Sequence, residues 1–232
     1  MNTLVLFDID GTLVQGGPAK DAFHSAMEAT YGTRGAVDQV SFSGKTDPQI
    51  ARELLLGVGR SHAEVNAGLP QLWDLYLAGL GRRLPDLPME ILPGVVELLD
   101  VLDGLVEIGR GLVTGNILDG ARLKLGSADL HRRFPINGEL VGAFGCDSEH
   151  RDDLPGIAMM RAEKVWGRRF APERVVIVGD TPRDVACGQF AGTRTLAVAT
   201  GRFEVDALQS AGADLVLEDL SDTDRVVEWI LE

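Results

Sequence analysis

The chain has 232 residues, of which 45% are hydrophobic and 25% are charged, as expected for a globular protein with a sizeable buried core. Its formal net charge of −13 argues against a broad nucleic-acid-binding surface, which needs clustered positive charge. The chain has only two cysteines, no apolar run long enough to span a membrane, and an early acid at Asp8 where a secretory signal would be apolar. We therefore expect a cytoplasmic protein with reduced thiols and no nucleic-acid or membrane partner.

Most of the chain alternates short apolar runs with amphipathic helical patterns. The apolar runs predict strands over residues 3–7, 107–116, 174–180, 193–200 and 214–217. Helices are predicted over 95–102, 117–126, 154–167, 183–192, 205–213 and 223–232. In the helix over 154–167, we expect Ile157, Met160, Ala162 and Val165 to form a buried stripe. The alternation predicts an α/β fold, a doubly wound parallel sheet with helices on both faces.

Residues 15–90 break this alternation. Three helical patterns follow one another there, over 18–32, 46–59 and 62–84, with no convincing strand between them. We interpret residues 15–18 as a flexible entry to this region and residues 84–94 as a proline-rich return. The simplest organisation is an α/β core domain formed by residues 1–14 and 91–232, with an inserted helical cap domain over 15–90.

Polar side chains follow three of the predicted strands. Asp8 and Asp10 come after the first strand, Thr114 after the second, and Asp180 and Asp184 after a later one. In a parallel α/β sheet, ligands bind beyond the carboxyl ends of the strands. One such acid is commonly an N-cap or a solvated loop residue, but four at strand ends would repel one another without a cation. Oxygen ligands of this kind favour Mg²⁺.

Three motifs in these segments resemble those of the haloacid dehalogenase superfamily. DIDGT at 8–12, VTGN at 113–116 and VGDTPRD at 178–184 are similar to its motifs one, two and four, and they appear in the family's order. The helical insertion resembles the family's cap of the first type. The resemblance is closest to the small-molecule phosphatases, including phosphoglycolate-phosphatase-like and β-phosphoglucomutase-like proteins. It implies a Rossmann-like core.

The resemblance also implies roles for the four acids. Asp8 would be the nucleophile that forms an aspartyl-phosphate. Asp10 would protonate the leaving oxygen and then activate water, and a neighbouring carboxylate would help to keep it protonated. Asp8, the backbone carbonyl of Asp10, and Asp180 would bind Mg²⁺. Asp184 would hold a metal-bound water or orient the basic residue of the site.

Other motif residues are expected to bind the phosphoryl group. Thr114, with its hydroxyl and the adjacent amides of Gly115 and Asn116, matches the residue of motif two that holds the transferring group. Gly11 and Thr12 would supply the turn after the first strand and a backbone amide that faces the phosphate.

Motif three departs from the family pattern. The family usually has a lysine just before the helix that precedes the last motif, and here Arg151 occupies that place. Arginine can bind phosphate through two parallel hydrogen bonds, so the role can survive the change. Lys164 is the alternative, but it lies three turns into the following helix.

Within the predicted cap, FSGKTDPQI at 42–50 contains the turn Gly44-Lys45-Thr46-Asp47 before a helix. One interpretation is an ordinary loop in which Thr46 or Asp47 caps the helix. The other is a specificity loop in which Lys45 meets an anionic or hydroxylated group of the substrate. The sequence alone leaves both open.

The predicted function is that of a Mg²⁺-dependent phosphohydrolase for a small phosphorylated metabolite. A phosphosugar mutase of the β-phosphoglucomutase type is an alternative, because the two share their chemistry. A catalytically idle binding or regulatory member is a further alternative, which the motif-three departure leaves open. Asp10 argues against a true dehalogenase, a branch that lacks the second acid. The sequence does not choose between a monomer and a dimer.

Overall fold

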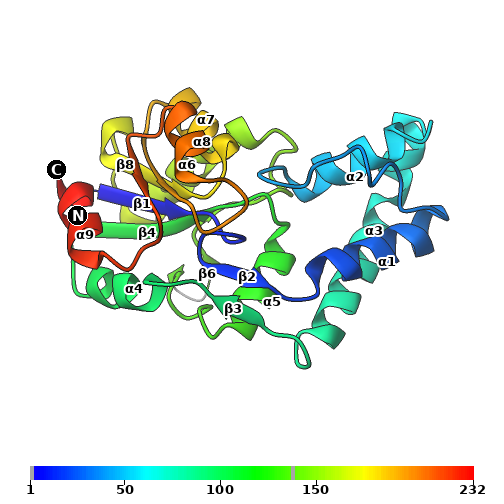
Figure 1. The fold of residues 1–232 in the computed structure, drawn as a ribbon, viewed down its shortest axis with the longest axis horizontal. Helices are drawn as coiled ribbons and strands as arrows, with labels where there is room; N and C mark the ends of the chain where they lie inside the picture. The colour runs from blue at the N-terminus through cyan, green and yellow to red at the C-terminus, as the bar shows by residue number, and fades with distance from the viewer. Residues whose placement is uncertain (1–2, 137–138) are drawn as a thin grey trace.

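The computed structural model describes residues 3–136 and 139–232, and the two residues before the first strand lie outside that range (Figure 1). Its main sheet has six parallel strands in the order β10-β9-β8-β1-β4-β7. They are β1 (Thr3–Phe7), β4 (Ile108–Val113), β7 (Gly142–Ala143), β8 (Val175–Gly179), β9 (Arg194–Val198) and β10 (Leu215–Leu217). The doubly wound parallel sheet is confirmed, and only the two-residue β7 was not predicted.

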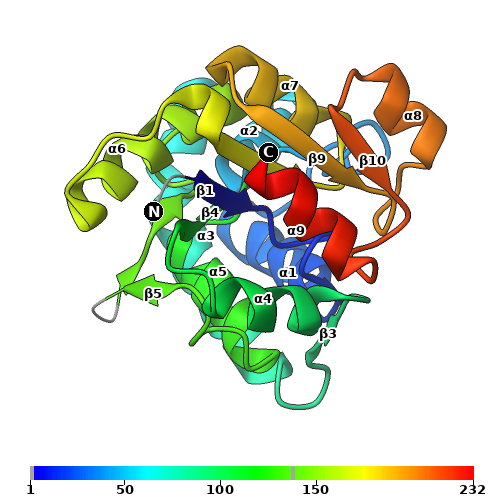
Figure 2. The ribbon, with the colours of Figure 1, turned by 90° about the vertical axis from the view of Figure 1, so that its left-hand side faces the viewer.

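Helices cover both faces of this sheet (Figure 2). On one face lie α4 (Val95–Asp103), α5 (Leu118–Ser127) and α9 (Thr223–Leu231), and on the other lie α6 (Leu154–Trp166) and α7 (Pro182–Ala191). Strand β1 is buried from both sides because Val5 and Phe7 pack into the first cluster while Leu4 and Leu6 pack into the second. This double burial explains why β1 reads as a continuous apolar run.

The buried stripe predicted for α6 is partly wrong. The helix forms as expected, but its fully buried residues include Leu154, Ala158 and Ala162, which are spaced four apart on one face. Met160 is 50% exposed and Val165 is 42% exposed, because they lie on other faces of the helix.

The three helices predicted for residues 15–90 are present as α1 (Ala19–Tyr31), α2 (Asp47–Leu56) and α3 (His62–Arg83). They pack together beyond the carboxyl ends of the central strands, on the right of Figure 1. Their starts have identifiable causes: Thr46 caps α2, and Ser61 with Glu64 forms a capping box at α3. We keep the division into core and cap at 14/15 and 90/91 as a prediction.

Each of the two connections to these helices contains a short strand, which the interpretation of a flexible entry and a proline-rich return did not include. Strand β2 (Val14–Gly16) pairs antiparallel with β3 (Met89–Ile91). Three residues per strand are too few to show an alternating pattern. The remaining elements are also short: β5 (Pro135–Ile136), β6 (Glu139–Leu140), η1 (Arg151–Asp153), η2 (Pro172–Arg174) and the helix α8 (Val205–Ser210). No helix in the described ranges combines the length and apolar character needed to cross a membrane.

Candidate active site

Asp8 lies where the winding of the sheet reverses. The chain passes from β1 to its neighbour β4 and then returns to β8 on the other side of β1. A crevice forms at such a switch point, outside the carboxyl ends of the strands. Asp8 directly follows β1, and its amide donates to the carbonyl of Val178 at 2.9 Å. The sheet thus fixes the backbone of Asp8, whose residue is 5% exposed.

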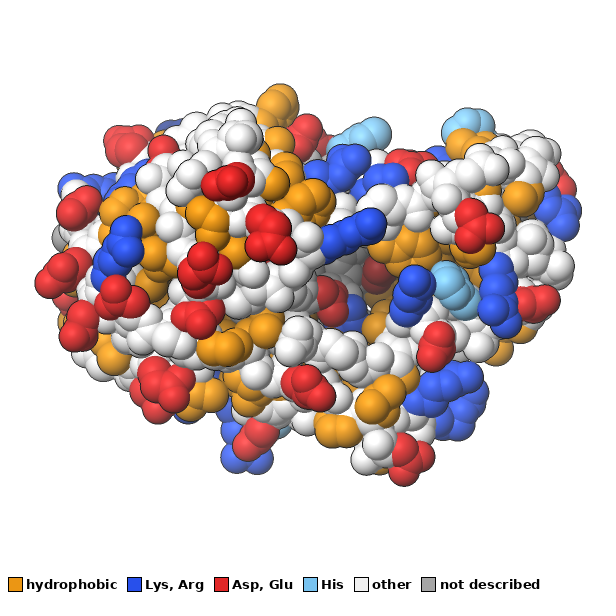
Figure 3. Space-filling view, in the orientation of Figure 1, with side chains coloured by type: hydrophobic (Ala, Val, Ile, Leu, Met, Phe, Trp, Pro, Cys, Tyr) orange, Lys and Arg blue, Asp and Glu red, His pale blue; other side chains and the backbone are white. Residues whose placement is uncertain are grey.

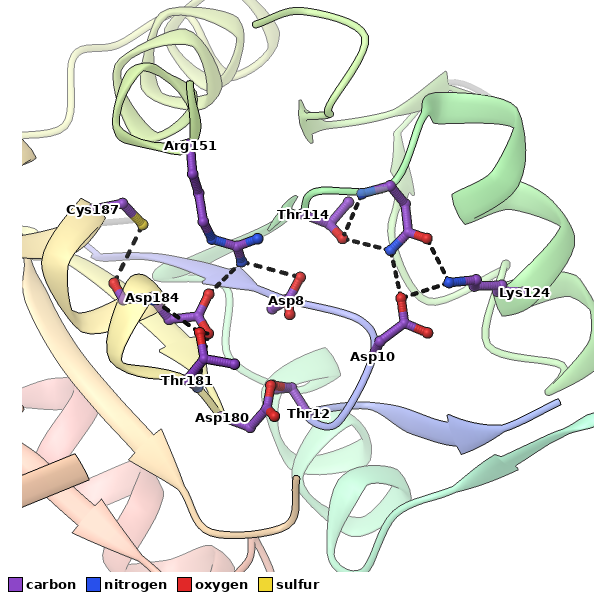
Figure 4. A network of polar contacts seen from close by, with 11 residues as sticks. Asp8, Asp10, Thr12, Thr114, Lys124, Arg151, Asp180, Thr181, Asp184 and Cys187 are labelled. Atoms are coloured by element: carbon purple, nitrogen blue, oxygen red, sulfur yellow. Dashed lines mark hydrogen bonds and ion pairs between the residues drawn. The ribbon is translucent and has the colours of Figure 1, made fainter. Parts of the chain in front are cut away.

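Three of the four predicted acids meet at this point. Ligand oxygens of Asp8, Asp180 and Asp184 all lie within 4.8 Å of one another. Arg151, which begins η1, donates to Asp184 and lies 3.3 Å from Asp8, measured from Nη2 to Oδ1 (Figure 4). The structure therefore brings Arg151 into the site and places Asp184 beside the basic residue. Lys164 is exposed on α6 and is not part of the site.

The electrostatics of this acidic cluster are unfavourable without a cation. Burial, moderated by Arg151 and reinforced by Asp184 and Asp10, raises the pKa of Asp8 to about 6. Burial, together with Asp184 and Asp8, raises the pKa of Asp180 to about 9. One guanidinium does not balance three buried carboxylates. An excess of hard oxygen donors in one place fits a divalent ion such as Mg²⁺.

The carboxylate of Asp10 lies apart from this cluster, among different partners. Its Oδ2 accepts hydrogen bonds from Asn116 Nδ2 at 2.7 Å and from Lys124 Nζ at 2.6 Å. Asn116 Nδ2 also donates to Thr114 Oγ1 at 2.8 Å. A role for Asp10 as a metal ligand would therefore fall to its backbone carbonyl, as the family resemblance implies.

Lys124 is the main site residue that the sequence analysis missed. It lies on α5, is 4% exposed, and also donates to Asn116 Oδ1 at 2.6 Å. Burial alone would lower the pKa of Lys124, but Asp10 and its other neighbours hold it above the usual value. From the sequence we expected only another carboxylate beside Asp10. The structure places the ammonium of Lys124 against it as well. A lysine in a helix normally lies on the solvated face, so nothing in its residue type indicated a place for Lys124 in the site. The one feature that could have indicated it is that Lys124 lies on the helix directly after the TGN motif.

Gly11 and Thr12 form the turn after β1, as predicted, but their amides do not face the cavity. The Gly11 amide donates to Val14 at 2.8 Å and the Thr12 amide to Ile9 at 3.4 Å, both within the turn. Instead, Thr12 Oγ1 donates to Asp180 Oδ1 at 3.3 Å. Gly11 has a φ of +86°, and a Cβ there would lie 2.3 Å from Asp180 Oδ2, so only glycine fits.

The loop before α2 docks onto the loop after β4. The amide of Asp47 donates to the carbonyl of Gly115 at 2.8 Å, and a Cβ on Gly115 would lie 2.1 Å from the carbonyl oxygen of Lys45. Lys45 lines the cavity, but its ammonium donates to Glu53. The N-cap interpretation is confirmed for Thr46, and the specificity role of Lys45 stays a prediction.

These elements enclose a cavity of about 380 Å³ between the sheet edge and the predicted cap. Its floor carries Asp8, Asp10 and Asp180. Figure 3 shows the hollow with lysine and arginine side chains at its rim, and Lys20 and Arg202 are exposed lining residues there. The acidic chain therefore concentrates positive charge where an anion would enter.

The chain is similar to known proteins over most of its length. The HAD-hydrolase-like family model matches residues 155–223. N-acetylmuramic acid 6-phosphate phosphatase of Pseudomonas aeruginosa is 29% identical over 92% of this chain and 89% of its own. Phosphoglycolate phosphatase 1 of the same organism is 27% identical over 98% of this chain and 82% of its own. A HAD hydrolase of family IA, variant 3, from Entamoeba histolytica superposes with a TM-score of 0.71 at 18% identity, over the full length of both chains.

The fold is thus the α/β fold of the HAD hydrolase from Entamoeba histolytica, a parallel sheet with helices on both faces. The chain is similar over most of its length to phosphatases, and its C-terminal part matches the HAD-hydrolase-like family model. These similarities agree with the resemblance predicted from the three motifs.

Proposed function

We propose that the chain is a Mg²⁺-dependent phosphohydrolase that acts on a small phosphorylated metabolite through an aspartyl-phosphate on Asp8. The meeting of Asp8, Asp180 and Arg151 in one cavity, with Asp184 beside them, carries this proposal. A phosphate monoester is largely dianionic at neutral pH. Its approach to a carboxylate nucleophile requires compensating positive charge on the same floor.

The acidic cluster would hold the metal ion. Asp8, the backbone carbonyl of Asp10, and Asp180 are the proposed protein ligands, with Asp184 beside them. When bound, Mg²⁺ neutralises charge on the carboxylates and on the phosphate, which lowers the electrostatic barrier between them.

The reaction then proceeds in two displacements. A carboxylate oxygen of Asp8 attacks phosphorus, the bond from phosphorus to the ester oxygen breaks, and Asp10 gives that oxygen a proton. A water molecule next attacks phosphorus, Asp10 takes a proton from the water, and the bond to Asp8 breaks to release phosphate. Lys124 and Asn116 orient the Asp10 carboxylate toward the cavity through the hydrogen bonds described above.

The phosphoryl oxygens would be bound by Arg151, by the Thr114 hydroxyl and by the Gly115 amide. The Asn116 amide, which donates to Thr114 Oγ1 at 3.3 Å, would have to leave that partner to bind phosphate. Arg151 is 5% exposed, and its buried Nε has no hydrogen-bond partner in the described part of the chain. Because buried donors are normally satisfied, an unpaired one supports a ligand role for this guanidinium. Lys45 would act on the leaving group.

The direct test is phosphate release from an aryl phosphate and from a panel of phosphorylated metabolites, with Mg²⁺ and with EDTA. We expect activity only with the metal, none in Asp8→Asn, and a loss of roughly 10²–10⁴-fold in Asp10→Asn. Asp206→Asn, which alters an exposed acid on α8, is the matched control and should match wild type. A mutase would convert a phosphosugar without net phosphate release, and an idle protein would leave every ester intact. Either result would contradict the proposal.

A further inference from the structure

Three polar side chains that line the cavity lie outside the acidic cluster of Asp8, Asp180 and Asp184. Asp47 begins α2, Tyr76 lies on α3, and Lys124 approaches from α5. All three line the same cavity as Asp8 and Asp10. A leaving group that extends from the bound phosphoryl group into this cavity would meet them.

Asp47 is fixed by backbone contacts and keeps one oxygen for a ligand. Its Oδ2 accepts a hydrogen bond from the amide of Ile117 at 2.8 Å, and its own amide donates to Gly115 at 2.8 Å. Its Oδ1 has no hydrogen bond to any residue that the structure describes. Asp47 therefore presents a rigidly held acceptor to the cavity.

Tyr76 presents a buried hydroxyl to the same space. The residue is 2% exposed, and its ring packs edge-on against Phe23 with the ring centres 5.6 Å apart. The hydroxyl makes no hydrogen bond to the residues that the structure describes. Because Tyr76 lines the cavity, its hydroxyl can donate to or accept from a ligand there.

Lys124 supplies a hydrogen-bond donor to the cavity that Asp47 and Tyr76 also line. Two of its three ammonium protons are used by Asp10 and Asn116, each at 2.6 Å. The third remains available. An alcohol group donates one hydrogen bond and accepts others, so a carboxylate, a phenol and an ammonium together match the needs of a hydroxyl.

We infer that Asp47, Tyr76 and Lys124 form a subsite for a hydroxyl-bearing leaving group, so that the substrate is the phosphate ester of a sugar or another polyol. The substrate's hydroxyl donates to Asp47 and accepts from Lys124 or Tyr76. This inference rests on the proposed phosphatase function and narrows its substrate class.

The local charge disfavours an anionic group in this position. Asp10 and Asp47 place two acidic groups beside the single ammonium of Lys124. Lys45, a cation of the same loop as Asp47, is already paired with Glu53. A carboxylate next to the phosphorylated carbon would be repelled by Asp47, whereas a hydroxyl can donate a hydrogen bond to it.

The size of the cavity agrees with a polyol. Its volume of about 380 Å³ lies within the range of sites that enclose whole small molecules. A two-carbon acid would leave much of it to water. Phe23 and Phe42 add apolar walls of the kind that pack against the carbon skeleton of a bound ligand.

The test compares two small phosphate esters, glycerol 3-phosphate and 2-phosphoglycolate, which present a hydroxyl or a carboxylate next to the phosphorylated carbon. We expect kcat/KM to favour glycerol 3-phosphate by about tenfold or more in the wild type, as expected for hydrogen bonds to a charged group. Asp47→Asn keeps an acceptor for Ile117 but removes the charge, and it should reduce this ratio by about tenfold. Tyr76→Phe should also reduce this ratio of kcat/KM values. If Asp47→Asn does not fold, the ratio measured for Tyr76→Phe tests the subsite instead.

Two matched controls alter the same groups outside the cavity. Asp74→Asn removes an exposed charge on α3, and Tyr31→Phe removes a hydroxyl that donates to Val65; both should keep the wild-type ratio. A wild type that prefers 2-phosphoglycolate, or folded variants with an unchanged ratio, would overturn the inference and leave the phosphatase proposal standing. Failure to hydrolyse even an aryl phosphate would overturn the proposed function itself, and the inference with it.

Discussion

Replacement of Asp180 by asparagine should stabilise the metal-free protein, and the gain should grow with pH. The carboxyl is 4% exposed, and burial beside Asp184 and Asp8 raises its pKa from 3.8 to about 9. Because the folded-state pKa lies above the unfolded one, its contribution to stability is complete below pH 3.8 and is lost progressively as the pH rises toward 9. Within that window, the loss is about 1.4 kcal/mol for each pH unit.

Urea unfolding in EDTA measures this directly. Between roughly pH 6 and pH 8, this carboxyl should cost the wild type about 3 kcal/mol of unfolding free energy, and Asp180→Asn should escape that cost. Asn keeps the shape of the side chain, so the Thr12 contact and the close approach of Gly11 are preserved. Added Mg²⁺ should raise the stability of the wild type more than that of the variant. Identical pH slopes for the two proteins in EDTA would refute the reasoning.

Further predictions concern the remaining parts of the site. Asp8→Asn should abolish phosphate release while the circular dichroism spectrum stays close to wild type, because only the nucleophile's charge is removed. Arg151→Ala should lower kcat/KM on every substrate by about tenfold or more, since hydrogen bonds to charged groups contribute about 1.5–3 kcal/mol. Arg151→Lys should recover part of that loss, and equal rates for wild type and Arg151→Ala would exclude a phosphate contact. Gly115→Ala should raise KM, because the new Cβ would lie 2.1 Å from the carbonyl oxygen of Lys45 and push the docked loop away; an unchanged KM would contradict this. Lys45→Ala should lower kcat/KM for the physiological metabolite more than for an aryl phosphate, and equal effects would leave Lys45 with no specificity role.

The features that the sequence predicted correctly depend on local patterns. The run TLVLF at 3–7 is β1 to the residue, because burial on both faces leaves no polar position in it. Asp8, Asp180 and Asp184 converge because parallel strands bring their carboxyl ends to one edge. Arg151 could be placed from its position before a predicted helix, and it lies against Asp8 and Asp184.

The features that the sequence did not predict depend on contacts between distant segments. Asp10 and Lys124 are 114 positions apart, and no periodic pattern links them. The role of Asp47 arises from docking against Gly115 and Ile117, whereas in the sequence it is simply an acid at a helix start. The β2–β3 ribbon was missed for the same reason, because each strand is recognisable only beside its partner.

The most direct test of the mechanism is to locate the phosphoryl group on the enzyme during turnover. Asp10→Asn is the best protein for it, because an aryl phosphate has a good leaving group and needs Asp10 mainly for the second displacement. We predict that acid quenching of this variant with an aryl phosphate and Mg²⁺, followed by peptide mass mapping, finds one phosphoryl group on Asp8. The same experiment with Asp8→Asn should find none. Phosphate release by wild type, together with the absence of any phosphoryl group on Asp8 in both wild type and Asp10→Asn, would contradict the covalent mechanism.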